Sequence, residues 1–135
     1  MAKDFLHETV KQLLIEDGWK ITEDPYRLQY EPAWLIDLGA EKLFAAERGL
    51  EKIAVEVKSF REESFAHEFH AILGQYLNYR LALEQVEMER MLYLAVPLSV
   101  YELEFQVTGI QHAITHFQLK LLVYNPHTFK IQWIT

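Results

Sequence analysis

The segment KIAVEVKSF, residues 52–60, constrains the fold most, because its side chains alternate between the two faces of an extended chain. One face carries Ile53, Val55 and Val57, and the other carries Ala54, Glu56 and Lys58. Branched aliphatic residues at a spacing of two predict a β-strand with one buried face. The charged pair on the other face leaves two interpretations, an ordinary solvated strand face or one wall of a metal-dependent active site.

The segments around this strand predict an α/β fold with a central mixed β-sheet flanked by helices. Extended segments rich in aromatic and branched residues precede it, namely WKI (19–21), YRLQY (26–30), WLIDL (34–38) and KLFAAER (42–48). We expect them to form an antiparallel meander, with the RGLE turn joining its last two strands. A helical pattern over 64–83 and a mostly apolar strand over 90–98 follow. Helices should therefore cover both faces of one sheet.

The two ends of the chain carry helix signals of their own. Asp4 is a candidate cap for an opening helix, and Gly18 is a candidate stop. Two capping-box patterns, Ser99 with Glu102 and Thr108 with Gln111, predict short helices late in the chain. The segments 119–124 and 129–134 then predict a closing pair of strands.

Length and composition bound the class of protein. A chain of 135 residues predicts a single domain, residues 1–135. The lack of cysteine excludes disulfides and thiolate zinc sites, and with no signal peptide we expect a cytoplasmic protein. The longest apolar run, LYLAVPL, is too short to cross a membrane.

The net charge of −7 argues against strong sequence-independent binding to DNA, which relies on Lys and Arg neutralising phosphates. DNA as a partner therefore requires a bound divalent cation, dimerisation or a second protein.

Glu56 and Lys58 fit the chemistry of metal-assisted phosphodiester cleavage. Two or three carboxylate oxygens can hold Mg²⁺ or Mn²⁺, while a further group orients or deprotonates the attacking water. Glu56 and Lys58 share one strand face, roughly 6–7 Å apart, and Asp37 on an earlier strand can face them. The carbonyl oxygen of Val57 is a further candidate ligand. The two-residue spacing of Glu56 and Lys58 is by itself weak evidence for an active site, so a solvated strand face with an incidental ion pair is an alternative.

Gln75 and Tyr79, in the segment GQYLNYR, add a second feature to this candidate site. They are four residues apart, so they project from one face of the predicted helix. An amide and a phenol there can position a phosphate or order a metal-bound water. The alternative is that Tyr79 packs in the core and Gln75 satisfies a backbone group.

These motifs carry a resemblance to a known group of proteins. Asp37, the Glu56-Val57-Lys58 motif and the Gln75-x-x-x-Tyr79 helix resemble the PD-(D/E)xK nuclease superfamily, and in particular its RecB-like branch. Over nearly the whole chain, the sequence is similar to the XisH family, the cyanobacterial fdxN element excision controlling factors. The segments that carry this similarity are AKDFLHETVKQLLIEDGWKIT, IDLGAEKLFAAE, KIAVEVKSF, LGQYLNYRLALE and LYLAVPL.

The resemblance implies a restriction-endonuclease-like fold and a role in programmed excision of a DNA element by a separate recombinase. It implies Asp37 and Glu56 as ligands of Mg²⁺ or Mn²⁺, Lys58 as the catalytic lysine, and Gln75 with Tyr79 as supporting residues. It also implies an XisI-type partner protein, and we expect a homodimer or a hetero-complex. The proline of the superfamily motif is absent, and Ile36 stands before Asp37.

Two functions of different kind follow from these observations. One is a metal-dependent DNA endonuclease, and the other is a non-catalytic regulatory module on the same fold that docks a recombinase or an XisI-type partner. The complete set of Asp37, Glu56, Lys58, Gln75 and Tyr79 favours the first, and the acidic charge favours the second.

Several other polar residues are expected to lie outside the site. Glu8 falls away from the apolar side of the opening helix, so we expect a surface residue. His67 and His70 share a helix but lack a third ligand, so we expect surface residues as well. The remaining histidines form no constellation in the sequence, and they are His7, His112, His116 and His127.

Overall fold

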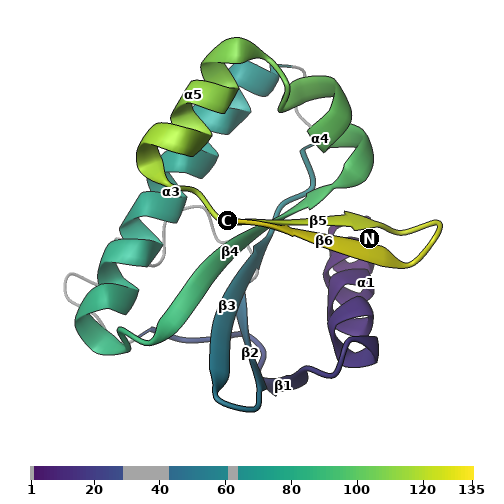
Figure 1. The fold of residues 1–135 in the computed structure, drawn as a ribbon, viewed down its shortest axis with the longest axis vertical. Helices are drawn as coiled ribbons and strands as arrows, with labels where there is room; N and C mark the ends of the chain where they lie inside the picture. Colours follow the sequence, from purple (N-terminus) through teal and green to yellow (C-terminus); the bar gives the residue numbers. More distant parts are fainter. Residues whose placement is uncertain (1, 29–42, 61–63) are drawn as a thin grey trace.

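The computed structural model describes residues 2–28, 43–60 and 64–135, and its centre is one six-stranded sheet (Figure 1). The strand order is β1-β2-β3-β4-β5-β6, the same as the order along the chain. The strands are β1 (Lys20–Glu23), β2 (Leu43–Arg48), β3 (Glu51–Val57), β4 (Arg90–Pro97), β5 (Leu121–Asn125) and β6 (Lys130–Ile134).

The sheet is mixed, because its pairings change direction at the centre. β1, β2 and β3 pair antiparallel, β3 pairs parallel with β4, β4 pairs parallel with β5, and β5 and β6 form an antiparallel hairpin. Parallel neighbours need crossover connections, and here helices supply both of them. The predicted α/β class and the closing strand pair are confirmed, and of the predicted antiparallel meander the strands 20–23, 43–48 and 51–57 are confirmed.

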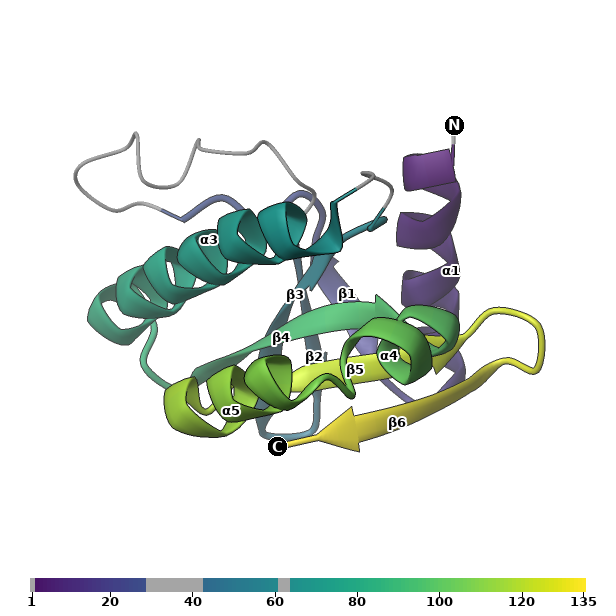
Figure 2. The same ribbon diagram turned by 90° about the horizontal axis from the view of Figure 1, so that it is seen from above.

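Helices cover both faces of the sheet, as Figure 2 shows from above. On one face lies α1 (Ala2–Glu16), and on the other lie α3 (Phe65–Val86), α4 (Leu98–Glu104) and α5 (Thr108–Phe117). Among the helices that the structure describes, none is both long enough and apolar enough to traverse a lipid bilayer.

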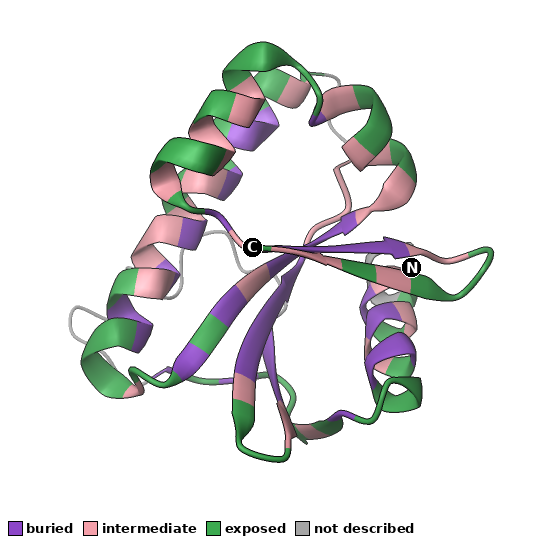
Figure 3. Ribbon diagram, in the orientation of Figure 1, coloured by how far each residue is buried: buried purple, intermediate pink, exposed green. Residues whose placement is uncertain are grey.

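The two faces of the sheet belong to two separate cores, and Figure 3 shows both as buried stretches of ribbon. The alternation in β3 decides which residue joins which core. Val55 and Val57 are buried on the α1 side, while Ala54 is buried on the α3 side. Because side chains alternate along a strand, Glu56 is directed to the α3 side with Ala54.

Helix ends differ in detail from the sequence-based prediction. α1 begins at Ala2, two residues before the predicted cap at Asp4, whereas Gly18 ends the helix as expected, with a φ of 95°. Ser64 caps α3 by accepting a hydrogen bond from the His67 amide.

Both short helices predicted late in the chain are confirmed as α4 and α5, but the two capping boxes that predicted them are wrong. Pro97 and Val107 occupy the cap positions of α4 and α5, with no side-chain cap bond, so Ser99 and Thr108 lie inside the helices. The fixed φ of Pro97 suits the extended conformation of a cap residue, which explains why α4 begins directly after β4.

One predicted strand and the predicted burial of β4 differ from the structure, and a second predicted strand lies outside the described residues. Tyr26–Leu28 of the YRLQY segment has no strand conformation, although both named side chains are buried. The WLIDL segment, with Asp37, lies outside the described residues. β4 is not buried throughout, because Met91 is exposed and Tyr93 half-buried.

Candidate functional site

Glu56 is a fully buried carboxylate near the end of β3. Its relative exposure is 0%, and its neighbours across the sheet are Leu43 on β2 and Leu94 on β4. Both neighbours are buried in the core that α3 covers. A carboxylate loses several kcal/mol of hydration in such a setting, so charged groups persist there only when they are paired or bind a metal.

Lys58 follows the last residue of β3 and lies at the rim of this buried region. It is partly exposed and lines a cavity of about 330 Å³ together with Gln75 and Asn78 of α3. The structure thus brings together the lysine of the strand motif and the glutamine of the helix motif, which are far apart in the sequence.

Tyr79 shares the buried face of α3 with Glu68 and Ile72, whose relative exposures are 2% to 3%. Gln75, one turn before Tyr79, is half-buried at the edge of that face. Tyr79 therefore packs in the core on the same side of the sheet as Glu56, while Gln75 reaches the cavity beside Lys58.

Asp37, the other predicted metal ligand, lies outside the described residues. The pairing of its carboxylate with Glu56 therefore remains a prediction.

Glu68 is a buried acid that the sequence analysis did not select as a site residue. It lies in the first turn of α3 and lines a cavity of about 190 Å³ with Phe60 and Phe65. The available signal was its position four residues before Ile72 and eleven before Tyr79, because these spacings place an acidic residue on the same helix face as core residues.

His7 also belongs to a constellation that the sequence analysis missed. It is 2% exposed, its Nε2 lies 3.0 and 3.1 Å from the two carboxylate oxygens of Asp24, and its ring contacts Phe44 edge-on. Lys11 Nζ lies 2.5 Å from Asp24 and 2.9 Å from Glu8.

Donor atoms of His7, Glu8 and Asp24 lie within 4.8 Å of one another, but the Lys11 ammonium already forms an ion pair with each of the two carboxylates. Phe44 belongs to the α1-side core, which places the cluster on the sheet face opposite Glu56.

This cluster shifts two pKa values in opposite directions. Burial alone would raise the pKa of Asp24, but the hydrogen bond from Lys11 and the neighbouring His7 outweigh it, and the pKa is lowered. Burial opposes the charge of Lys11, yet bonds to Asp24 and Glu8 raise its pKa. Glu8 itself is exposed, as expected for a surface residue, and so are His67, His70, His112, His116 and His127.

Comparisons with known proteins agree with this architecture. The family model described as XisH protein matches residues 1–132. The crystal structure of an XisH family protein from Nostoc punctiforme PCC 73102 is 45% identical, with a TM-score of 0.84, and the match covers 96% of this chain and 98% of that one. The crystal structure of an fdxN element excision controlling factor protein from Anabaena variabilis is 46% identical, with a TM-score of 0.85, and the match covers 98% of this chain and 99% of that one.

No curated protein sequence matches the chain. The family model and both crystal structures nevertheless cover almost the full length, at an identity where fold and ancestry are shared. The chain belongs to the XisH family.

Proposed function

We propose that this protein controls the excision of a DNA element, and that it does so through a metal-dependent phosphodiester-cleaving site at the end of β3. The first part rests on the relative from Anabaena variabilis, which is described as an fdxN element excision controlling factor. The second part rests on one observation, the fully buried carboxylate of Glu56 on an otherwise apolar region of the sheet.

The donor set suits Mg²⁺ or Mn²⁺, which prefer oxygen ligands. Glu56 supplies one carboxylate, the carbonyl of Val57 is adjacent, and Asp37 would supply the second carboxylate. A bound cation there would offset the hydration that Glu56 loses on burial. Bound Mg²⁺ supplies charge stabilisation at a phosphate and lowers the pKa of a coordinated water.

The protein side chains have separate tasks in this proposal. The Lys58 ammonium, at the rim of the cavity, neutralises the phosphate and orients the attacking water. The Gln75 amide shares that cavity and donates to a phosphate oxygen. Tyr79 is buried on α3, so it acts by holding the helix against the sheet face that carries Glu56.

A regulatory module that docks a recombinase or an XisI-type partner is the second candidate function, and the charge of −7 favours it. Both candidate functions are compatible with a protein that forms a homodimer or a complex with another protein. Light scattering of the protein alone tests the homodimer, and light scattering after mixing with an XisI-type protein tests the hetero-complex.

The test of cleavage uses Mn²⁺ and Mg²⁺ with supercoiled plasmid, linear duplex and single-stranded DNA, each with and without an XisI-type protein. We expect Glu56→Gln and Lys58→Met to lower any cleavage rate at least about a hundredfold, the usual effect of losing one charged catalytic group. Glu51→Gln is the matched control, because Glu51 is exposed at the opposite end of the same strand.

Cleavage that survives unchanged in Glu56→Gln would contradict the assignment of the cleavage site to Glu56. Absence of cleavage under every condition would assign the protein to the regulatory module.

A further inference from the structure

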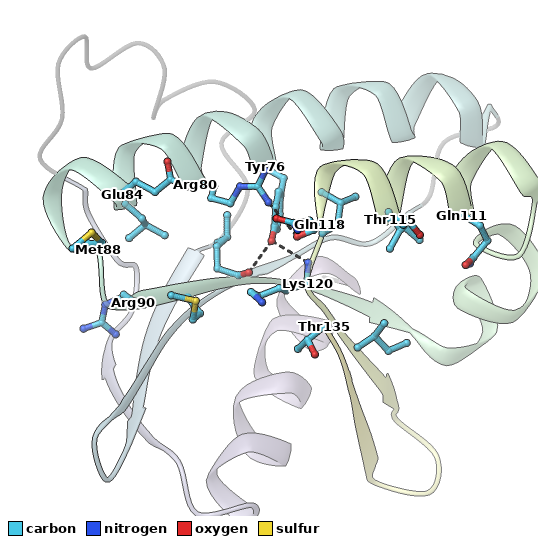
Figure 4. A pocket seen from close by; sticks show the side chains of 16 residues that line it. Tyr76, Arg80, Glu84, Met88, Arg90, Gln111, Thr115, Gln118, Lys120 and Thr135 are labelled. Atoms are coloured by element: carbon cyan, nitrogen blue, oxygen red, sulfur yellow. Dashed lines mark hydrogen bonds between the residues drawn. The ribbon is translucent and has the colours of Figure 1, made fainter.

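A second cavity lies away from Glu56, between α3, α5 and the start of β4 (Figure 4). Its volume is about 680 Å³, inside the range of roughly 300–1,000 Å³ typical of small-molecule sites. It has no lining residue in common with the cavity beside Lys58 and Gln75. Whatever binds there is therefore separable from the proposed cleavage site.

Arg80 forms one cationic wall of this cavity and is held in place by the end of α5. Its Nη1 donates to the carbonyls of Phe117 and Gln118, at 2.7 and 3.1 Å, and its guanidinium lies 5.5 Å from the centre of the Tyr76 ring. Gln118 adopts a left-handed conformation that ends α5 and directs these carbonyls to Arg80. The guanidinium is thus oriented before any ligand arrives.

Lys120 supplies a second lining cation and lies below Tyr76 and Gln118 in Figure 4. Its backbone amide donates to the Tyr76 hydroxyl at 3.1 Å, and that hydroxyl donates to the Leu92 carbonyl at 2.9 Å. The Lys120 ammonium pairs with no carboxylate of the described residues, although the protein has a net charge of −7.

The other charged groups of the lining are Arg90, Glu84 and the terminal carboxylate of Thr135. Arg90 is committed to Glu87 and Glu47. Glu84 is the acidic side chain among the described lining residues, and it lies on the exposed side of α3. Arg80 and Lys120 are thus two lining cations that form no ion pair with a carboxylate of the described residues, and a site between them favours an anion.

The rest of the lining is mixed, with the polar residues Gln111, Thr115, Gln118 and Thr135 beside apolar side chains. Leu83, Leu92 and Leu119 are buried, while the side chains of Met88 and Met91 are 73% and 41% exposed at the mouth. Methionine adapts its shape to a bound apolar group. Tyr76 is the aromatic ring among the described lining residues, and Arg80 covers it, so a nucleobase finds no free ring for stacking.

From these features we propose that the cavity binds a small organic anion with a hydrocarbon body. The carboxylate or phosphate group lies between Arg80 and Lys120, and the hydrocarbon contacts the leucines and the two methionines. The proposal concerns a ligand site additional to DNA cleavage and stands whether or not Glu56 binds a metal.

The experiment compares four probes with the same eight-carbon chain: octanoate, octyl phosphate, octylammonium and 1-octanol. Binding to the full chain is measured by titration of backbone amide signals in NMR, with Gln118 and Lys120 as reporters. We expect both anions to bind at least about tenfold more tightly than 1-octanol, and the cation to bind most weakly, since charged hydrogen bonds stabilise the anions. The ratio between octanoate and octyl phosphate distinguishes carboxylate from phosphate ligands.

Lys120→Met is the decisive variant, because it removes an ammonium that makes no ion pair with a described residue. It should weaken octanoate or octyl phosphate about tenfold and leave 1-octanol unchanged. Lys130→Met, an exposed lysine of β6 outside the cavity, is the matched control and should bind like the wild type. Arg80→Lys keeps the charge and tests whether the guanidinium geometry matters.

Equal affinity for all four probes, or equal weakening in Lys120→Met and Lys130→Met, would overturn the proposal. So would anion binding that shifts amides elsewhere and leaves Gln118 and Lys120 unchanged.

Discussion

Replacing Arg90 by Met should destabilise this protein more than any change to a surface ion pair. Arg90 opens β4, and its side chain is 4% exposed. Its Nε and Nη2 donate to Glu87 at 2.9 and 3.0 Å, Nη2 also donates to Glu47 at 3.0 Å, and Nη1 donates to the Ile53 carbonyl at 2.9 Å. One guanidinium thus joins the end of α3 to three neighbouring strands.

The expected loss in the free energy of unfolding depends on the two carboxylates that remain after the guanidinium is removed. Losing one partner of a buried ion pair costs about 3–5 kcal/mol. The side chains of Glu87 and Glu47 are 23% and 34% exposed, so water can reach both carboxylates. We therefore expect a loss of unfolding free energy at the lower end of that range, about 3 kcal/mol. For a domain of this size, such a loss lowers the melting temperature by roughly 9–15 °C.

The pH dependence gives the prediction a second, independent measurement. The hydrogen bonds from Arg90 lower the pKa of Glu87, against the opposing effect of burial. A lowered folded-state pKa contributes stability above the unfolded pKa, about 4.3, and this stability is lost as the pH falls through the folded value. The stability gap between wild type and Arg90→Met should be widest near pH 7 and narrow below about pH 4.

Urea denaturation followed by circular dichroism measures this gap, and Arg48→Met serves as the control. Arg48 pairs with Asp17 and Glu51, but its side chain is 38% exposed, so its loss should cost about 1 kcal/mol or less. If Arg90→Met cost no more than Arg48→Met at every pH, the carboxylates would be fully hydrated without their partner and the reasoning from burial would be refuted.

Three further predictions concern other parts of the molecule. Mn²⁺ at about one hundred times its dissociation constant should raise the melting temperature of the wild type and of Glu51→Gln by roughly 8–14 °C, and that of Glu56→Gln much less. Thermal unfolding measures these shifts, and equal shifts in all three proteins would place the metal elsewhere. Asp24→Asn should lower the free energy of unfolding by about 2 kcal/mol near pH 7. Because the pKa of Asp24 is lowered in the folded state, its carboxylate stabilises the fold above about pH 3.9, and this stability is lost in more acid solution. Urea denaturation should therefore show a larger difference in unfolding free energy between wild type and variant at pH 7 than at pH 3. Tyr76→Phe should cost about 1–3 kcal/mol because it leaves a buried carbonyl and an amide without their shared hydroxyl, whereas Tyr101→Phe should change the unfolding free energy little.

The sheet was predictable from the sequence where periodicity dominates. In β3, the alternation of aliphatic residues placed Val55 and Val57 in one core and Glu56 on the other face. The helix over 64–83 was predictable for the same reason, and its spacing placed Gln75 near Lys58.

Features that depend on contacts between distant segments were not predictable. His7 looked isolated, because Asp24 approaches it only after α1 packs against the sheet. Arg80 and Lys120 carry no local signal, since their shared cavity forms only when α3, α5 and β4 are assembled. The caps at Pro97 and Val107 were missed because a strand or turn that runs directly into a helix can replace a side-chain cap.

The identical order of the six described strands in the sheet and in the chain has a consequence for folding. No strand has to insert between two strands that have already paired, so the sheet can grow by addition at one edge as the chain leaves the ribosome. Each addition closes a loop between neighbouring strands, and the entropy lost rises only slowly with the length of that loop. The slowest addition should be β4 to β3, because parallel pairing of Lys52 with Arg90 requires α3 to form and cross over first.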